Sequence, residues 1–143
     1  MEKIAVIYYS NNGNTKQMAR FIYHTLKLEG HDVELYDVSN FPVTQIKKYQ
    51  KIALGCPASG KEDLDSGEFY PFLKKIEDSV SKIPCILFGS YGWGKGAFMS
   101  RFIRVAEGMG MTVLGSVIAN EYPNQEEEDN CISLAKVLAN YKI

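Results

Sequence analysis

The fold is decided near the start of the chain, by the stretch Ala5-Val6-Ile7-Tyr8-Tyr9-Ser10-Asn11-Asn12-Gly13-Asn14-Thr15. Its first residues are apolar, and most are β-branched or aromatic, which is typical of a buried strand. Apolar residues then recur at helical spacing, and they predict an amphipathic helix over Thr15 to Leu28, closed by Gly30. The stretch therefore indicates a strand, a short polar loop and a helix.

The same alternation continues along the rest of the chain. Further strands are predicted at Val33 to Tyr36, Ile52 to Leu54, Ile86 to Phe88 and Thr112 to Ile118. Helical stripes begin at Phe69, Phe98 and Cys131, and Phe41 to Tyr49 is only weakly helical. Five strands that alternate with helices predict an α/β fold with a doubly wound parallel sheet, and we expect residues 1–143 to form a single domain.

Composition excludes several classes of protein. The formal net charge is -1, so the chain has no basic surplus with which to neutralise a nucleic-acid backbone. The first apolar run is too short to span a membrane and has no signal-peptide cleavage pattern, so we expect a cytoplasmic protein without membrane attachment. Three cysteines stand far apart without a metal-binding spacing, and we interpret them as reduced packing residues: Cys56, Cys85 and Cys131.

Ligands of a doubly wound sheet bind at the carboxyl ends of its strands, where the strand order reverses. Three loops should meet there: Ser10 to Thr15, Cys56 to Glu68 and Gly89 to Gly96. The first loop opens directly into a helix, whose free backbone N–H groups and dipole favour an anion such as phosphate. The same residue types also form ordinary helix N-caps, so this loop alone leaves both interpretations open.

Other phosphate motifs match less well. A dinucleotide turn needs three glycines where this loop has one, and a Walker loop would end in Gly-Lys-Ser or Gly-Lys-Thr. The strand ends also lack the acidic cluster of a phospho-accepting receiver domain. The loop Gly89 to Gly96 instead surrounds Tyr91 and Trp93 with glycines, which favours an exposed aromatic platform for a flat ligand. In the middle loop, the acids beyond Gly60 by themselves indicate only a solvated rim.

A phosphate loop, a tryptophan among glycines and a glycine turn at one sheet edge resemble the flavodoxin family. The resemblance runs from Ala5-Val6-Ile7-Tyr8-Tyr9-Ser10 through Gly-Ser-Tyr-Gly-Trp-Gly (89–94) to Asn120-Glu121 and the last helix. It is closest to the short-chain members, because the fifth strand lacks the additional loop of the long-chain group. It implies a flavodoxin-like fold with strand order 2-1-3-4-5 and noncovalently bound FMN.

The resemblance also implies site residues, none of them catalytic. The FMN phosphate would be held by Ser10, Asn11, Asn12, Gly13, Asn14 and Thr15. The ribityl chain and the ring would be lined by Pro57, Ala58, Ser59, Gly60, Lys61, Glu62, Ser90, Tyr91, Gly92, Trp93, Gly94, Asn120 and Glu121. Trp93 would stack on the ring and Ser59 would face its other side. The Gly60-Lys61 peptide would flip to let its carbonyl accept the proton on flavin N5 after one-electron reduction, and glycine permits such a flip.

The implied function is that of a low-potential one-electron carrier. It would shuttle electrons between flavodoxin or ferredoxin reductases and acceptor enzymes through transient docking, and we expect a monomer. Two residues depart from the family pattern: Asn12 replaces a hydroxyl residue, and Pro57 stands where some members place a phosphate-contacting serine. Three alternatives remain at this point: a small FMN-dependent oxidoreductase, an accessory flavoprotein for one partner such as a ribonucleotide reductase subunit, and a flavin-free binding module.

Overall fold

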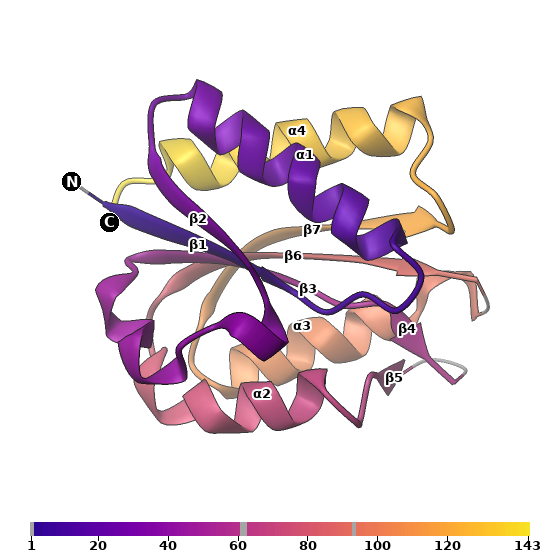
Figure 1. The fold of residues 1–143 in the computed structure, drawn as a ribbon, viewed down its shortest axis with the longest axis horizontal. Helices are drawn as coiled ribbons and strands as arrows, with labels where there is room; N and C mark the ends of the chain where they lie inside the picture. The colour runs from indigo at the N-terminus through magenta and orange to yellow at the C-terminus, as the bar shows by residue number, and fades with distance from the viewer. Residues whose placement is uncertain (1, 61–62, 93) are drawn as a thin grey trace.

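A five-stranded parallel sheet forms the centre of the molecule (Figure 1). The structure is a computed structural model that describes residues 2–60, 63–92 and 94–143. The sheet order is β2-β1-β3-β6-β7, which confirms the predicted order 2-1-3-4-5. The strands are β1 (Lys3–Tyr8), β2 (Asp32–Asp37), β3 (Lys51–Gly55), β6 (Pro84–Tyr91) and β7 (Thr112–Asn120).

Helices cover both faces of the sheet, as a doubly wound fold requires. One face carries α1 (Asn14–Leu28) and α4 (Gln125–Asn140), and the other carries α2 (Phe69–Ile76) and α3 (Phe98–Gly108) (Figure 1). The weakly helical segment between β2 and β3 forms two 3-10 turns, η1 (Val38–Asn40) and η2 (Val43–Lys48). Two more short turns follow α2 and β6, at η3 (Glu77–Ser79) and η4 (Gly94–Gly96).

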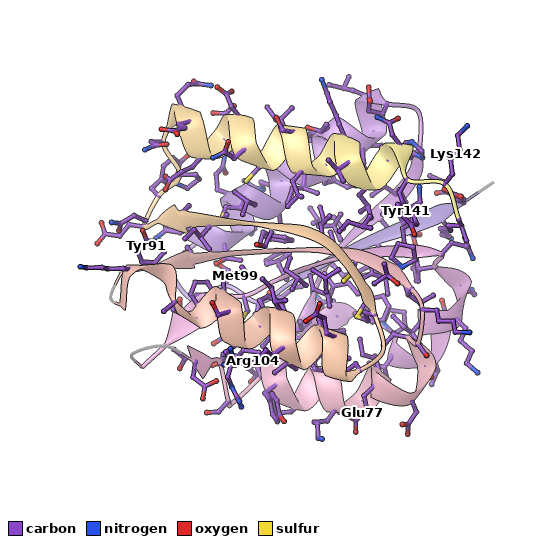
Figure 2. The ribbon with its side chains drawn as sticks, turned by 180° about the vertical axis from the view of Figure 1, so that it is seen from behind. Glu77, Tyr91, Met99, Arg104, Tyr141 and Lys142 are labelled. Atoms are coloured by element: carbon purple, nitrogen blue, oxygen red, sulfur yellow. The ribbon has the colours of Figure 1, made fainter. Side chains whose placement is uncertain are left out.

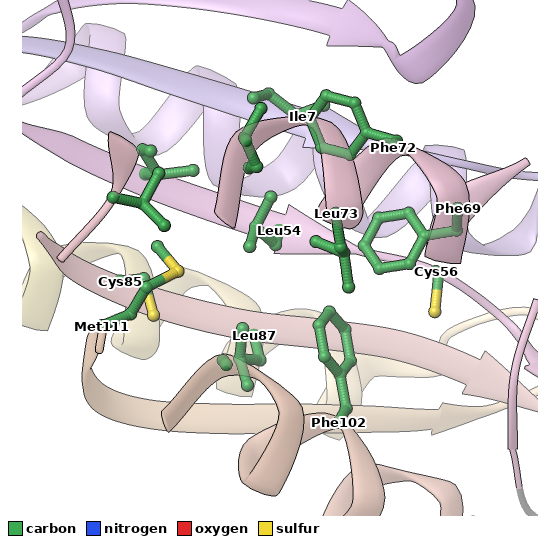
Figure 3. Packing of buried hydrophobic residues seen from close by; sticks show 14 of the residues in the cluster. Ile7, Leu54, Cys56, Phe69, Phe72, Leu73, Cys85, Leu87, Phe102 and Met111 are labelled. Carbon is green, nitrogen blue, oxygen red and sulfur yellow. The ribbon is translucent and has the colours of Figure 1, made fainter. Parts of the chain in front are cut away.

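Apolar residues fill both layers because successive side chains of a strand point to opposite faces. Ile7, Leu54 and Leu87 pack toward α2 and α3, where they meet a group of phenylalanine rings (Figure 3). Their neighbours Val6 and Ile86 belong to the layer under α1 and α4. The continuously apolar strands of the sequence are therefore buried on both faces, as predicted.

The structure adds two features that the sequence pattern did not predict. β7 runs two residues beyond the predicted end at Ile118, and its pairing with β6 shifts near Gly115, where Cys85 faces Val113 and Ile86 already faces Gly115. A small antiparallel hairpin, β4 (Ala58–Ser59) and β5 (Asp63–Leu64), projects from the end of β3 outside the main sheet. The hairpin and the extended end of β7 lie at the carboxyl side of the fold, where they help to shape the site.

Candidate functional site

The polar loop after β1 is organised by its own side chains. Ser10 Oγ accepts a hydrogen bond from the Gly13 N–H at 3.1 Å, and Asn12 Oδ1 accepts one from the Asn14 N–H at 3.2 Å. Gly13 has a φ of 91°, a left-handed conformation that glycine adopts without steric cost, and it is the N-cap of α1. The first turn of α1 contains no acidic residue, so the positive end of the helix dipole faces the loop without a compensating charge.

A buried pair of hydroxyl groups joins this loop to the centre of the sheet. Thr15 Oγ1 and Ser90 Oγ are 2.7 Å apart and hydrogen-bonded, and either oxygen can donate. The exposed fraction is 0% for Thr15 and 3% for Ser90, so the pair is shielded from water. The first turn of α1 is thereby fixed to the end of β6, two strands away from β1.

The loops at the carboxyl edge of the sheet surround a cavity of about 360 Å³. Its walls come from the ends of four strands: β1, β3, β6 and β7. Nine of the predicted site residues line it: Asn11, Asn12, Asn14, Pro57, Ala58, Ser90, Tyr91, Gly92 and Glu121. The three loops expected to converge therefore do meet at one edge, together with the turn after β7.

Seven of the other predicted residues are described by the structure and stand outside this lining. Ser10, Gly13 and Thr15 hold the loop in shape through the hydrogen bonds just described. Asn120 precedes the lining residue Glu121, and its N–H donates to Glu127 Oε2 at 2.9 Å. Gly94 begins the turn η4 beyond Tyr91, while Ser59 and Gly60 belong to the β4–β5 hairpin. Lys61, Glu62 and Trp93 lie outside the described residues.

The hairpin after β3 has a fixed base. Gly60 follows β4 with a φ of 62°, in the positive range that the predicted glycine turn requires. Arg101 Nε of α3 donates to Asp63 Oδ1 at 3.0 Å, so β5 is attached to α3. The pKa of the Asp63 carboxyl group is lowered mainly by the hydrogen bond from the Leu64 backbone N–H and to a smaller extent by the contact with Arg101. An ion pair thus holds the hairpin against α3, while Ala58 of β4 lines the cavity.

The acids of this segment are more than a solvated rim. Asp63 pairs with Arg101, and Asp65 Oδ2 accepts from the N–H groups of Glu68 at 2.6 Å and Phe69 at 2.9 Å, where it supports the start of α2. Burial, followed by the negative charges of Asp65, Glu68 and Asp37, raises the pKa of Tyr9, which directly precedes the phosphate loop. The carboxylates of Asp37, Asp65 and Glu68 therefore lie close enough to Tyr9 to act on its hydroxyl group.

The cysteines of the chain are packing residues. All three cysteines are buried and free, as predicted, and burial raises the pKa of each thiol. Within residues 2–60, 63–92 and 94–143, no three His, Cys, Asp or Glu side chains gather to hold a metal ion. Across the same part of the chain, no helix has the length and apolar character needed to cross a membrane.

Sequence reasoning missed one residue of the cavity wall. Tyr122 lines the cavity next to Glu121, in the turn between β7 and α4. The sequence around it, Asn-Glu-Tyr-Pro, carries no glycine or phosphate motif that would have marked it. The aromatic side chain in a predicted loop that follows a strand end was the only available signal.

Comparisons with known proteins agree with this geometry. The family model described as flavodoxin matches residues 6–134. The flavodoxin of Clostridium beijerinckii is 35% identical over 94% of this chain and 98% of its own length, and that of Megasphaera elsdenii is 35% identical over 95% and 98%. The solution structure of two-electron reduced Megasphaera elsdenii flavodoxin superimposes with a TM-score of 0.89, covering 96% of this chain and 99% of that one. The sequence likeness of this chain to these flavodoxins and the fold that it shares with them together show that the chain belongs to the flavodoxin family of small FMN-binding electron carriers.

Proposed function

We propose that this flavodoxin holds FMN in the cavity at the carboxyl edge of its sheet. Ser10 to Thr15 hold the phosphate, whereas the loops Pro57 to Glu62 and Ser90 to Gly94, with Asn120 and Glu121, hold the ribityl chain and the ring. The observation that carries the proposal is the convergence of four strand ends on one cavity beside the uncompensated amino end of α1. Residues 1–143 act as one domain in this account.

The residues of the cavity wall fit the chemistry of FMN. Amide groups of Asn11, Asn12 and Asn14 lie on the phosphate side, and the Ser90 hydroxyl lies deeper at the end of β6. A Cβ added at Gly13 or Gly92 would meet no other atom within 4 Å, so the backbone there is open to close approach. Polar donors at one end and an open glycine loop at the other suit an anionic group attached to a flat ring.

Residues of this chain perform binding and positioning, and bound FMN supplies the one-electron chemistry. The segment 10–15 contains no lysine or arginine, so a phosphate is neutralised by backbone N–H groups, amides, hydroxyls and the helix dipole. The Thr15–Ser90 hydrogen bond keeps the phosphate loop in register with β6. Gly60 gives the hairpin a residue that tolerates positive φ, next to the predicted flipping peptide.

Redox partner proteins are implied by the family, and the carboxylates near Tyr9 indicate how they dock. Reductases and acceptor enzymes with basic surfaces bind transiently over the cavity mouth, near Asp37, Asp65 and Glu68, which surround Tyr9. Such encounters are small and weaken with salt, because exposed charges are screened over about 8–10 Å at physiological ionic strength. The protein works as a cytoplasmic monomer in this proposal.

A reductive titration followed by absorbance tests the proposed function. Purified protein supplied with FMN should bind it and take up two electrons in two separate one-electron steps at different potentials. A single two-electron transition, with no separation of the steps, would contradict the carrier role. A protein that stays colourless after FMN is added would contradict FMN binding itself.

A further inference from the structure

Tyr122 stands out among the aromatic residues of the chain. It lies on the cavity wall with 63% of its surface exposed, while Tyr141, at the opposite end of the fold, is the other strongly exposed tyrosine of the described chain. A large aromatic side chain left in solvent beside a ligand cavity loses unfavourable hydration when a ligand covers it.

The backbone on both sides fixes the position of Tyr122. Glu121 has a φ of 58°, which is rare for a residue with a side chain, and its N–H donates to the Tyr91 carbonyl at 2.8 Å. Pro123 is buried, and a proline restricts the residue before it to an extended conformation. Tyr122 therefore sits between a left-handed residue tied to β6 and an anchored proline.

Glu127 of α4 holds the same turn from the other side. Its Oε2 accepts from the Asn120 N–H and its Oε1 accepts from the Asn124 N–H, both at 2.9 Å. The Asn124 side chain accepts in return from the Glu127 N–H at 2.8 Å, which completes a capping box. The turn that presents Tyr122 is thus preorganised by six residues around it.

Sheet order places Tyr122 across the cavity from the phosphate loop. β3 and β6 separate β1 from β7, so Asn12 and Tyr122 reach the cavity from its two sides, with Pro57 and Ser90 between them. A ligand whose phosphate lies on the loop extends into a cavity whose opposite wall includes Tyr122. We propose that Tyr122 is a further FMN-contacting residue, whose ring packs over the ribityl chain; this inference rests on the proposed function.

Flavin affinity of two variants tests the contact. Tyr122→Ala should raise the dissociation constants of both FMN and riboflavin about tenfold, equivalent to about 1.4 kcal/mol, because both ligands carry the ribityl chain. Tyr122→Phe keeps the ring and should bind both as the wild type does. The unfolding midpoint of the FMN-free protein should stay unchanged in both variants, since the side chain is exposed.

Two affinity results would overturn the inference. Unchanged affinity in Tyr122→Ala would show that the ring makes no contact with the ligand. Weaker binding of FMN without weaker binding of riboflavin would place the contact on the phosphate instead of the ribityl chain. Flavin fluorescence, which is quenched on binding, measures both dissociation constants.

Tyrosine nitration by tetranitromethane in the dark, with peptide mapping, gives an independent readout. Saturating FMN should slow nitration of Tyr122 and leave Tyr141 unaffected, because Tyr141 lies at the amino end of the sheet, far from Tyr91 (Figure 2). Equal nitration of Tyr122 with and without bound FMN would overturn the contact while leaving the proposed function intact. A wild-type protein that fails to bind FMN would instead overturn the proposed function.

Discussion

At the amino end of the sheet the Lys51 side chain is completely buried, whereas at the carboxyl end the polar residues Asn11 and Asn12 are exposed on a cavity wall. Lys51 Nζ donates to the carbonyls of Tyr141 at 2.7 Å and Ala139 at 3.2 Å, and it pairs with Glu2 Oε1 at 2.9 Å. Figure 2 shows Tyr141 and Tyr91 at these opposite ends.

The difference separates structural polar groups from binding groups. Lys51 meets the last carbonyls of α4, where a cation stabilises the negative end of the helix dipole, and all its partners belong to the chain. At the carboxyl end the amides and the amino end of α1 border open space, where a ligand can use them. Buried polar groups whose partners all belong to the chain stabilise the fold, whereas polar groups that border a cavity are available to bind a ligand.

Removing the lysine should produce the largest effect on stability. Lys51→Ala deletes a buried side chain and leaves two carbonyls without their donor, so the free energy of unfolding should fall by about 3–5 kcal/mol. Urea unfolding of the FMN-free protein measures this. FMN affinity should remain unchanged while the variant is folded, because β3 separates the two ends by roughly 15 Å.

Lys51→Met is the matched control, since it keeps the length of the side chain and removes the ammonium. Its loss should be smaller, about 1–3 kcal/mol, the cost of leaving buried hydrogen-bonding groups unsatisfied. A loss below about 1 kcal/mol in Lys51→Ala would contradict the structural role of the amino end.

A glycine pair probes the carboxyl end. A Cβ at Gly89 would lie 2.1 Å from the Cys56 carbonyl oxygen and 2.8 Å from the Phe98 ring, so Gly89→Ala should cost about 1–3 kcal/mol and weaken FMN binding by displacing the cavity floor. Gly92→Ala is the control, because nothing lies within 4 Å of its added Cβ. Equal unfolding energies for the two variants would show that the strand ends are less tightly packed than described.

The hydroxyl pair should give the smallest effect on stability. Thr15→Val and Ser90→Ala each remove one partner of a buried hydrogen bond and should cost about 1 kcal/mol. The double variant should cost clearly less than the sum of the two, because the same bond is lost in all three proteins. Additive losses in urea unfolding would show that Thr15 and Ser90 act independently.

Sequence periodicity was sufficient for the fold because the determining signals are local. The apolar runs at β3 and β6 and the stripe of α1 each indicate one element, and the handedness of crossovers then leaves few possible sheets. The convergence of the three loops followed from the parallel sheet alone. The 3-10 turns of 43–48 and the two-residue strands of the hairpin carry too few residues for a periodic signal.

Long-range contacts explain what the sequence could not reveal. Lys51 begins a strand and would ordinarily be exposed, but its carbonyl partners lie 88 and 90 residues further along the chain. Tyr122 gains its place on the cavity wall from Tyr91 and Glu127, which no sequence motif connects to it. Within the candidate site, the residues of the loops were predictable from the sequence, but the hydrogen bonds that hold these loops in place were not.

The most direct test of the account compares FMN with riboflavin, which lacks the phosphate. Removing the hydroxyls of the phosphate loop, in the variant Ser10→Ala with Thr15→Val, should weaken FMN binding about tenfold or more, because these hydroxyls hold the loop whose N–H groups and amides meet the phosphate. Riboflavin affinity should change far less, so the preference of the wild type for FMN should shrink. Equal losses for the two flavins would contradict the claim that Ser10 to Thr15 anchor the phosphate.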